Sequence, residues 1–151
     1  MGRLNLVGGD NEKLKTKCEY TNAKKAVATG NKLFAFTRNV GCLGLSANQV
    51  GIMERVCIAK INNKFKIFIN PHIIKSWGKQ VSEKEGCLSF PGVRGDIVRP
   101  QNIMVMWITI NNGIEISHEE VFTGMDAIVL EHEIDHLNGI RCIDKMKNIA
   151  L

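Results

Sequence analysis

The residues best suited to chemistry are two histidines, His132 and His136, which stand four positions apart. Residues four apart on a helix lie on the same face, so both imidazoles can point toward one metal ion. Glu133 follows the first histidine, where its carboxylate can reach a water on that ion without binding the ion itself. This HExxH pattern is typical of metal-dependent hydrolases, although so short a motif also recurs by chance on ordinary amphipathic helices.

A hydrolytic metal site usually has three protein ligands and one open position. The residues after His136 include neither histidine nor glutamate, which leaves only Cys142 and Asp144 as ligands there. Cys87 is the better candidate, because it stands between Gly86 and a Leu-Ser-Phe-Pro-Gly turn that leaves its side chain free to project. Its thiolate would be a strong ligand for a borderline-soft ion, although most free cysteines are simply small core residues.

A third segment, Gly44 to Gly51, combines small residues with a predicted bend. Small residues on a bend allow a ligand to approach the backbone closely. Gln49 in this segment can donate an amide N–H to a developing oxyanion. Taken alone, the segment also fits a tight connection between a helix and a strand.

Together, the three segments resemble the peptide deformylase family. They occur in the order Gly-Leu-Ser-Ala-x-Gln, Glu-Gly-Cys-Leu-Ser and His-Glu-x-Asp-His, and they span about residues 41–139, roughly two thirds of the chain. The second and third motifs are specific as a pair, because a thiolate combined with HExxH is a rare set of ligands.

The resemblance implies a hydrolase that removes the N-terminal formyl group from formyl-methionyl nascent peptides and releases formate. Glu133 would act as general base and then as general acid, first taking a proton from the metal-bound water and then protonating the leaving amine. Gln49 and the backbone N–H of Leu88 would stabilise the oxyanion. The metal ligands that it implies are Cys87, His132 and His136.

The resemblance also implies a binding site for the peptide. The Gly44 backbone and Arg94 would lie along the peptide, and a hydrophobic pocket would take the methionine side chain. Met125 and Ile128 are candidates to line this pocket, because they stand one to two turns before the histidines on the same helical face. Arg99 and Asp135 are expected to form an orienting pair behind the site.

The ligand set and the family resemblance indicate different identities for the single divalent metal ion. A Cys-His-His set by itself suggests Zn2+. The resemblance implies Fe2+ as the native ion, with Zn2+, Ni2+ or Co2+ able to substitute for it. We favour Fe2+.

Two departures from the family pattern stand out. Cys42 occupies a position where the family usually has glycine, while Ser46 and Asn48 are tolerable variants. Bacterial members generally continue after the third motif into a C-terminal helix that docks on the ribosome, whereas this chain stops at Leu151, as in short phage-encoded forms. We therefore leave ribosome docking open.

Composition limits the remaining possibilities. The 151 residues are 44% hydrophobic and 23% charged, as expected for a single catalytic domain over residues 1–151. The five irregularly spaced cysteines argue against a disulfide framework. We expect no membrane association and a cytoplasmic location, in a bacterial or phage-infected cell by resemblance, because the sequence has no long apolar run and no signal-peptide pattern.

The net charge of +5 arises entirely in residues 1–40, which have eight basic and three acidic residues. A solvated helix face is the favoured explanation, and a patch for RNA is the alternative; we expect no specific DNA binding.

Two rival functions stay open: a metallopeptidase that cuts unformylated peptides, and a closed structural metal or nucleic-acid-binding module. The second rival needs a fourth metal ligand, for which the candidates are His118 and Cys142.

The elements that must position these residues follow from periodicity and turn signals. Residues 21–39 predict a helix, although Gly30 weakens that prediction, and residues 41–51 predict a glycine-rich bend. Strands are predicted at residues 55–61, 64–70, 73–77, 103–111 and 115–122, with hairpin turns at 62–63 and 112–113. Residues 92–100 look like a loop entering a strand. A helix at residues 124–137 would be capped by Thr123 and ended by Asn138-Gly139.

This order of elements predicts an α+β fold. Antiparallel β-sheets would pack around a central helix that carries the HExxH motif, with a further helix near the N-terminus.

Overall fold

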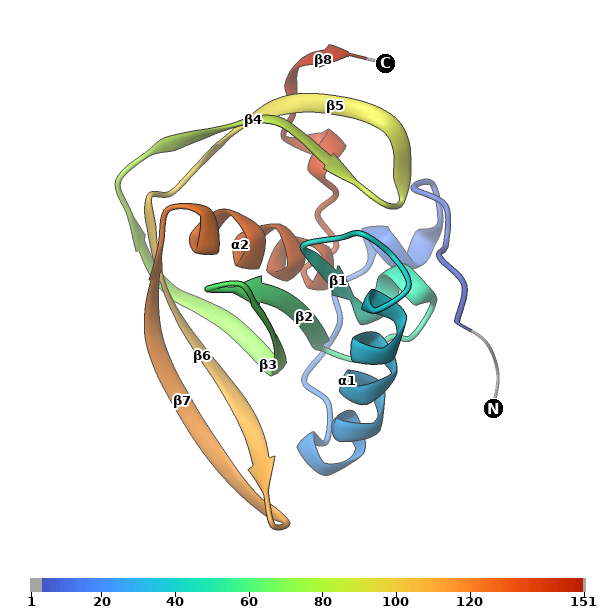
Figure 1. Cartoon of the computed structure of the whole chain (residues 1–151), viewed down its shortest axis with the longest axis vertical. Helices are drawn as coiled ribbons and strands as arrows, with labels where there is room; N and C mark the ends of the chain where they lie inside the picture. Colours follow the sequence, from blue (N-terminus) through green and yellow to red (C-terminus); the bar gives the residue numbers. More distant parts are fainter. Residues whose placement is uncertain (1–3, 151) are drawn as a thin grey trace.

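The computed structural model describes residues 4–150 and combines two antiparallel sheets with two α-helices (Figure 1). The expected α+β class is confirmed. From the N-terminus the elements are η1 (Glu12–Lys15), α1 (Ala23–Thr37), β1 (Gly44–Ser46), η2 (Ala47–Val50), β2 (Val56–Ile61), β3 (Lys64–Trp77), β4 (Gln80–Cys87), β5 (Phe90–Arg99), β6 (Asn102–Asn111), β7 (Ile114–Thr123), α2 (Met125–Leu137), η3 (Cys142–Asp144) and β8 (Lys147–Ala150).

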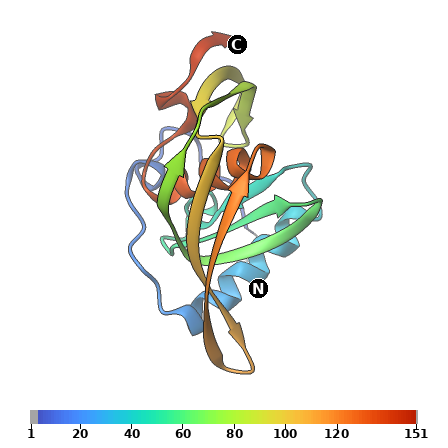
Figure 2. The same ribbon diagram turned by 90° about the vertical axis from the view of Figure 1, so that its left-hand side faces the viewer.

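The larger sheet has five strands in the order β1-β2-β3-β6-β7, and the smaller sheet has the order β4-β5-β8. Figure 2 shows the hairpin of β6 and β7, in gold and orange, extending past the rest of the molecule. Both predicted hairpin turns are present, because Asn62, Asn63, Asn112 and Gly113 all have the positive φ angles that tight turns between twisted strands require. None of the helices in residues 4–150 is long and apolar enough to span a membrane.

The larger sheet is covered by a helix on each face. Along β2, Cys57 and Ala59 face α2, whereas Val56 and Ile58 face α1, as the alternation of a strand requires. Strand β2 is therefore buried on both faces, which explains its nearly continuous run of apolar residues. Gly30 has a packing role in α1, because a Cβ at this position would stand 2.7 Å from the side chain of Ile67.

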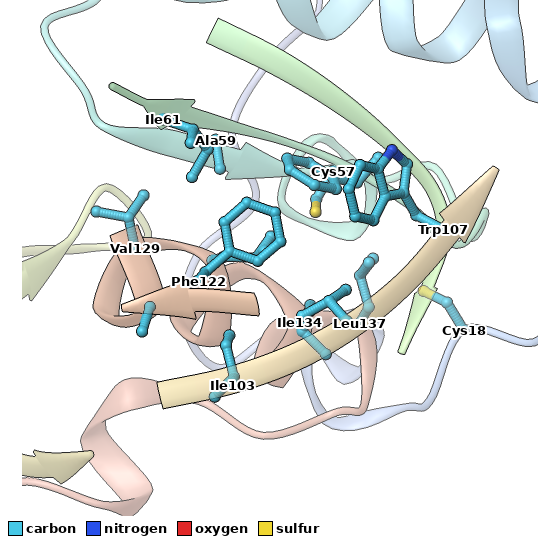
Figure 3. Packing of buried hydrophobic residues seen from close by; sticks show 14 residues of the cluster. Cys18, Cys57, Ala59, Ile61, Ile103, Trp107, Phe122, Val129, Ile134 and Leu137 are labelled. Atoms are coloured by element: carbon cyan, nitrogen blue, oxygen red, sulfur yellow. The ribbon is translucent and has the colours of Figure 1, made fainter. Parts of the chain in front are cut away.

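The hydrophobic cluster between α2 and the larger sheet fixes the height and rotation of the helix (Figure 3). The rings of Phe122 and Trp107 are tilted against each other with centroids 5.7 Å apart, and the Phe68 ring lies 5.0 Å from that of Trp107. Ile134 and Leu137 of α2 reach into the same cluster. Because aromatic pairs of this kind and buried aliphatic groups hold their geometry tightly, the opposite side of α2 is also held in place.

Three local expectations were wrong. Residues 92–100 were expected to form a loop, but they lie almost wholly in β5. Strand β4 was not predicted at all. Gly92, Gly95 and a run of charged residues hide the alternation of apolar and polar residues that marks a strand. The two strands predicted at 64–70 and 73–77 form one strand, β3, whose register shifts around Pro71.

Helix α2 is capped by Gly124, with φ of 64°, and not by Thr123, which is the last residue of β7. The Thr123 hydroxyl instead donates to Asn102 Oδ1 at 2.9 Å.

Candidate metal centre

Three side chains that could bind a metal converge between α2 and the end of β4. His132 Nε2 lies 3.1 Å from His136 Nε2, which lies 3.3 Å from Cys87 Sγ. All three ligand atoms lie within 4.8 Å of one another. A tetrahedral ion with ordinary zinc-like bond lengths would separate its ligand atoms by about 3.4–3.6 Å, so the set fits a metal ion.

Helical spacing and a tight hairpin bring the three residues together. The histidines are one turn apart on α2, so their rings are neighbours and meet edge to face. Cys87 ends β4 opposite Phe90 of β5, with Leu88 and Ser89 forming the turn between them. The hairpin therefore holds the Cys87 sulfur over the same face of α2.

A buried carboxylate that the sequence argument did not single out orients His132. Glu85 Oε1 lies 2.6 Å from His132 Nδ1 and also accepts a hydrogen bond from Arg99. Burial works to raise the pKa of Glu85, but hydrogen bonds from Arg99 and His132 outweigh it and hold the pKa below its ordinary value. Because the ionised carboxylate accepts the Nδ1 proton, His132 presents Nε2 to a metal.

Arg99 connects this carboxylate to two others on α2. Its side chain is fully buried and donates to Glu131 at 2.7 Å and to Asp135 at 3.2 Å, as well as to Glu85. Lys145 adds a second cation 2.7 Å from Asp135. The expected pair of Arg99 and Asp135 is present, as part of a larger network that fastens the β4–β5 hairpin to α2.

Glu133 is buried beside the two histidines and points toward the first motif. Its Oε1 has no hydrogen-bond partner, and a Cβ on Gly44 would stand 2.6 Å from its Oε2. Burial raises the pKa of Glu133 to about 7, with the charge of His132 opposing the rise. Only a glycine at position 44 leaves room for this carboxylate.

Gln49 is held firmly in the η2 turn. Its Oε1 accepts hydrogen bonds from the backbone N–H and the hydroxyl of Ser46, each at 3.0 Å. Its Nε2 is thereby turned toward Cys87 Sγ, 3.4 Å away, and Ser89 Oγ, 3.3 Å away. The neighbouring Asn48 amide donates to the His136 carbonyl at 2.6 Å, which fastens this turn to α2.

A cavity of about 500 Å3 opens onto the centre. In the cavity wall, the Arg94 side chain lies directly against the Gly86 backbone. A Cβ on residue 86 would stand 2.1 Å from the Arg94 guanidinium. Met125 lies at the rim with 63% of its surface exposed. The residues singled out from the sequence that line this cavity are Gly44, Gln49, Cys87, Leu88, Arg94, Met125, Ile128, His132 and Glu133.

Other candidate ligands lie elsewhere or have other partners. His118, in β7, stacks on Trp107 of β6 and lies 2.6 Å from the Thr109 hydroxyl, so it cannot act as a fourth ligand here. Asp144 is held by Arg141 at 2.9 Å. Within residues 4–150, Cys87, His132 and His136 form the one group of three or more potential metal ligands whose ligand atoms all lie within 4.8 Å of one another.

Comparisons with known proteins identify the family of this chain. The model of the polypeptide deformylase family matches residues 4–150. A peptide deformylase from Cytophaga hutchinsonii is 36% identical over 78% of this chain and 66% of its own length. One from Chlorobium luteolum is 38% identical over 78% of this chain and 63% of its own length. The chain thus spans slightly less than two thirds of these curated relatives.

Solved structures give the same result over the whole fold. A peptide deformylase from Thermotoga maritima superposes with a TM-score of 0.85 and 29% identity, covering 97% of this chain and 99% of that one. A Plasmodium falciparum peptide deformylase, solved as a complex with inhibitor, has a TM-score of 0.83 and 31% identity, covering 95% and 90%. Because the family model matches residues 4–150, nearly the whole chain, this chain belongs to the polypeptide deformylase family.

Proposed function

We propose that this chain is a single catalytic domain that hydrolyses the N-terminal formyl group of formyl-methionyl peptides, releasing formate and a free amine. The observation that carries the proposal is the convergence of Cys87, His132 and His136 beside an unpartnered buried carboxylate, Glu133. Membership of the polypeptide deformylase family supports the same reaction.

The three converging side chains would hold one divalent metal ion, a dependence that belongs to the family. When bound, such an ion supplies Lewis-acid activation of water and of the formyl carbonyl. We propose Fe2+ as the native ion, with Zn2+, Ni2+ or Co2+ able to replace it. Metal analysis of protein purified without oxygen separates these ions.

Glu133 would move the proton. Its carboxylate is next to the ligands in the sequence, faces the cavity and has one oxygen without a partner. It would take a proton from the attacking water and later donate it to the nitrogen of the leaving amine. A single buried group thus serves both halves of the hydrolysis.

Two N–H donors would stabilise the negative charge that develops on the formyl oxygen. The Gln49 amide nitrogen is fixed beside the Cys87 sulfur by the Ser46 contacts. The backbone N–H of Leu88 belongs to the hairpin turn that follows Cys87. Donors held in advance stabilise such a charge without reorganising during the reaction.

The cavity would select the substrate. Met125 and Ile128 offer an apolar wall for the methionine side chain, and the Gly44 backbone and Arg94 lie where an extended peptide could bond. Peptides without a formyl group would lack the reacting carbonyl.

The test is release of formate from formyl-Met-Ala-Ser by protein purified without oxygen, with bound metal measured in the same sample. Glu133→Gln keeps the shape of the side chain but removes the base, so formate release should fall by about 100-fold or more while the metal is retained. Glu115→Gln, an exposed change on β7, should leave both unchanged.

A fully metallated protein that releases no formate would contradict the proposal. Cleavage of unformylated peptides at a comparable rate would instead favour a metallopeptidase.

A further inference from the structure

An N-terminal strap, residues 7–13, contacts both loops that carry the proposed oxyanion donors. The Val7 N–H donates to the Gln49 carbonyl in η2 at 2.8 Å. Two residues later, Gly9 lies against Phe90, the first residue of β5, where a Cβ on the glycine would stand 2.1 Å from the aromatic ring. Figure 1 shows this blue segment beside the end of the β4–β5 hairpin.

The strap is fastened to the η2 turn at two further points. Lys13 Nζ donates to the Gly51 carbonyl at 2.9 Å. The Asn48 side-chain amide donates to the Lys13 carbonyl at 3.2 Å. With the bond from Val7, three hydrogen bonds oppose any sliding of the strap along η2.

Arg141 joins the strap to the same aromatic ring. Its guanidinium donates to the Gly9 carbonyl at 3.3 Å and lies 5.9 Å from the centre of the Phe90 ring, within the range of a cation–π contact. Asp144 accepts two hydrogen bonds from this guanidinium, at 2.9 and 3.2 Å, and so fixes its direction. No step of the proposed hydrolysis uses Arg141.

Phe90 connects the strap to the turn that follows Cys87. The two residues are paired across the hairpin, so only Leu88 and Ser89 stand between them. A two-residue turn has little conformational freedom once both of its ends are fixed. The position of Phe90 therefore sets the direction of the Leu88 N–H.

We propose that Gly9 and Arg141 are positioning residues for the oxyanion donors. Acting through the Phe90 ring, they hold the Leu88 N–H in a fixed place relative to the Gln49 amide. The inference rests on the donor roles proposed above. A methyl group at position 9 would displace the ring and the turn with it, and so weaken the stabilisation of charge in the transition state.

Two neighbouring glycines offer a matched pair of variants. Gly8 is exposed, and a Cβ there would meet nothing within 4 Å, whereas Gly9 is buried against Phe90. Neither glycine has a positive φ angle, so alanine strains the backbone at neither position. The two substitutions add the same methyl group to the same segment and differ in whether it reaches the aromatic ring.

The first measurement is formate release from formyl-Met-Ala-Ser by zinc-loaded protein, with kcat and KM determined separately. Gly9→Ala should lower kcat by about 10–100-fold with KM and zinc content unchanged, because a displaced oxyanion donor costs transition-state and not ground-state binding. Arg141→Met should lower kcat by a smaller factor, and Gly8→Ala should match the unmodified chain. An unchanged kcat in Gly9→Ala, a raised KM at unchanged kcat, or loss of zinc would each overturn the proposal.

The second measurement needs no turnover and is the amide NMR spectrum of the same zinc-loaded proteins. Gly9→Ala and Arg141→Met should shift the backbone signal of Leu88, whereas Gly8→Ala should leave it in place. An unmoved Leu88 signal in both variants would overturn the inference even if the unmodified chain releases formate. Absence of formate release from the unmodified chain refutes the proposed function instead, while the Leu88 signal still decides whether the strap sets the turn. If Gly9→Ala fails to fold, Arg141→Met carries both tests.

Discussion

Replacing Glu85 with glutamine would test how the metal centre is oriented. One carboxylate oxygen of Glu85 bonds to both His132 and Arg99, and the other bonds to the Arg99 Nε at 2.8 Å. A glutamine has only one acceptor oxygen, so its NH2 group must face at least one N–H donor in this buried space. The substitution therefore weakens the hold on His132 and on the β4–β5 hairpin together.

The expected size follows from these contacts. Loss of a carboxylate that orients a metal-binding histidine typically lowers metal affinity by about 10–100-fold, equivalent to about 1.4–2.8 kcal/mol. Leaving a buried guanidinium N–H against an amide donor should lower the free energy of unfolding of the metal-free protein by about 1–3 kcal/mol. Arg99 keeps its contacts to Glu131 and Asp135, which limits the second effect.

The assay is a competition titration of Zn2+ against a chromophoric chelator, accompanied by urea unfolding of the metal-free protein. Glu83→Gln is the matched control. Glu83 is exposed and stands two residues earlier on β4, and its substitution removes the same charge. Zinc affinity of Glu85→Gln within twofold of the unmodified chain would refute the reasoning. An equal loss in Glu83→Gln would assign the effect to overall charge.

Three further predictions concern other parts of the molecule. Gly44→Ala places a methyl group 2.6 Å from a Glu133 oxygen and should lower formate release by about 100-fold with metal content unchanged. Leu130→Ala opens a cavity at a fully buried position and should lower the free energy of unfolding in urea by about 2–5 kcal/mol. Burial raises the pKa of the Cys18 thiol from 9.0 to about 11, so its contribution to stability is complete below pH 9 and is lost as the pH rises toward 11. Urea unfolding across this range should show a steeper loss for the unmodified chain than for Cys18→Ala.

The predictions for Gly44 and Cys18 each have a control or a contradicting result. Gly8→Ala meets nothing within 4 Å and should leave formate release unchanged. Loss of metal in Gly44→Ala would mean that the methyl group disturbs the ligands and not the base. Equal pH profiles for Cys18→Ala and the unmodified chain would show that other groups cause the alkaline loss.

The parts of the fold that follow local rules could be predicted from the sequence. Helix α2 has the histidine pair that we propose binds metal at helical spacing, and the Asn112-Gly113 turn between two apolar runs marks the β6–β7 hairpin. The helix predicted at residues 21–39 begins two residues later than expected, after Asn22 accepts a hydrogen bond from the Lys25 N–H at 3.2 Å.

The missed features depend on distant parts of the chain. Strands β4 and β5 show little alternation of apolar residues, because one side of their hairpin is charged and bonds to α2. The ion pair between Arg99 and Glu131 joins residues 32 positions apart, a relation that spacing cannot reveal. Glu85 did leave a signal, because residues two apart on a strand share a face, which places it on the side of Cys87.

The burial of α2 has a kinetic consequence. Ten of its 13 residues are buried, from Ala127 to Leu137, and they include both histidines. Backbone amides enclosed in this way exchange with deuterium only when the whole domain opens. Metal should therefore leave and enter through the cavity without unfolding of α2. The rate of metal exchange is then independent of the rate at which the domain unfolds.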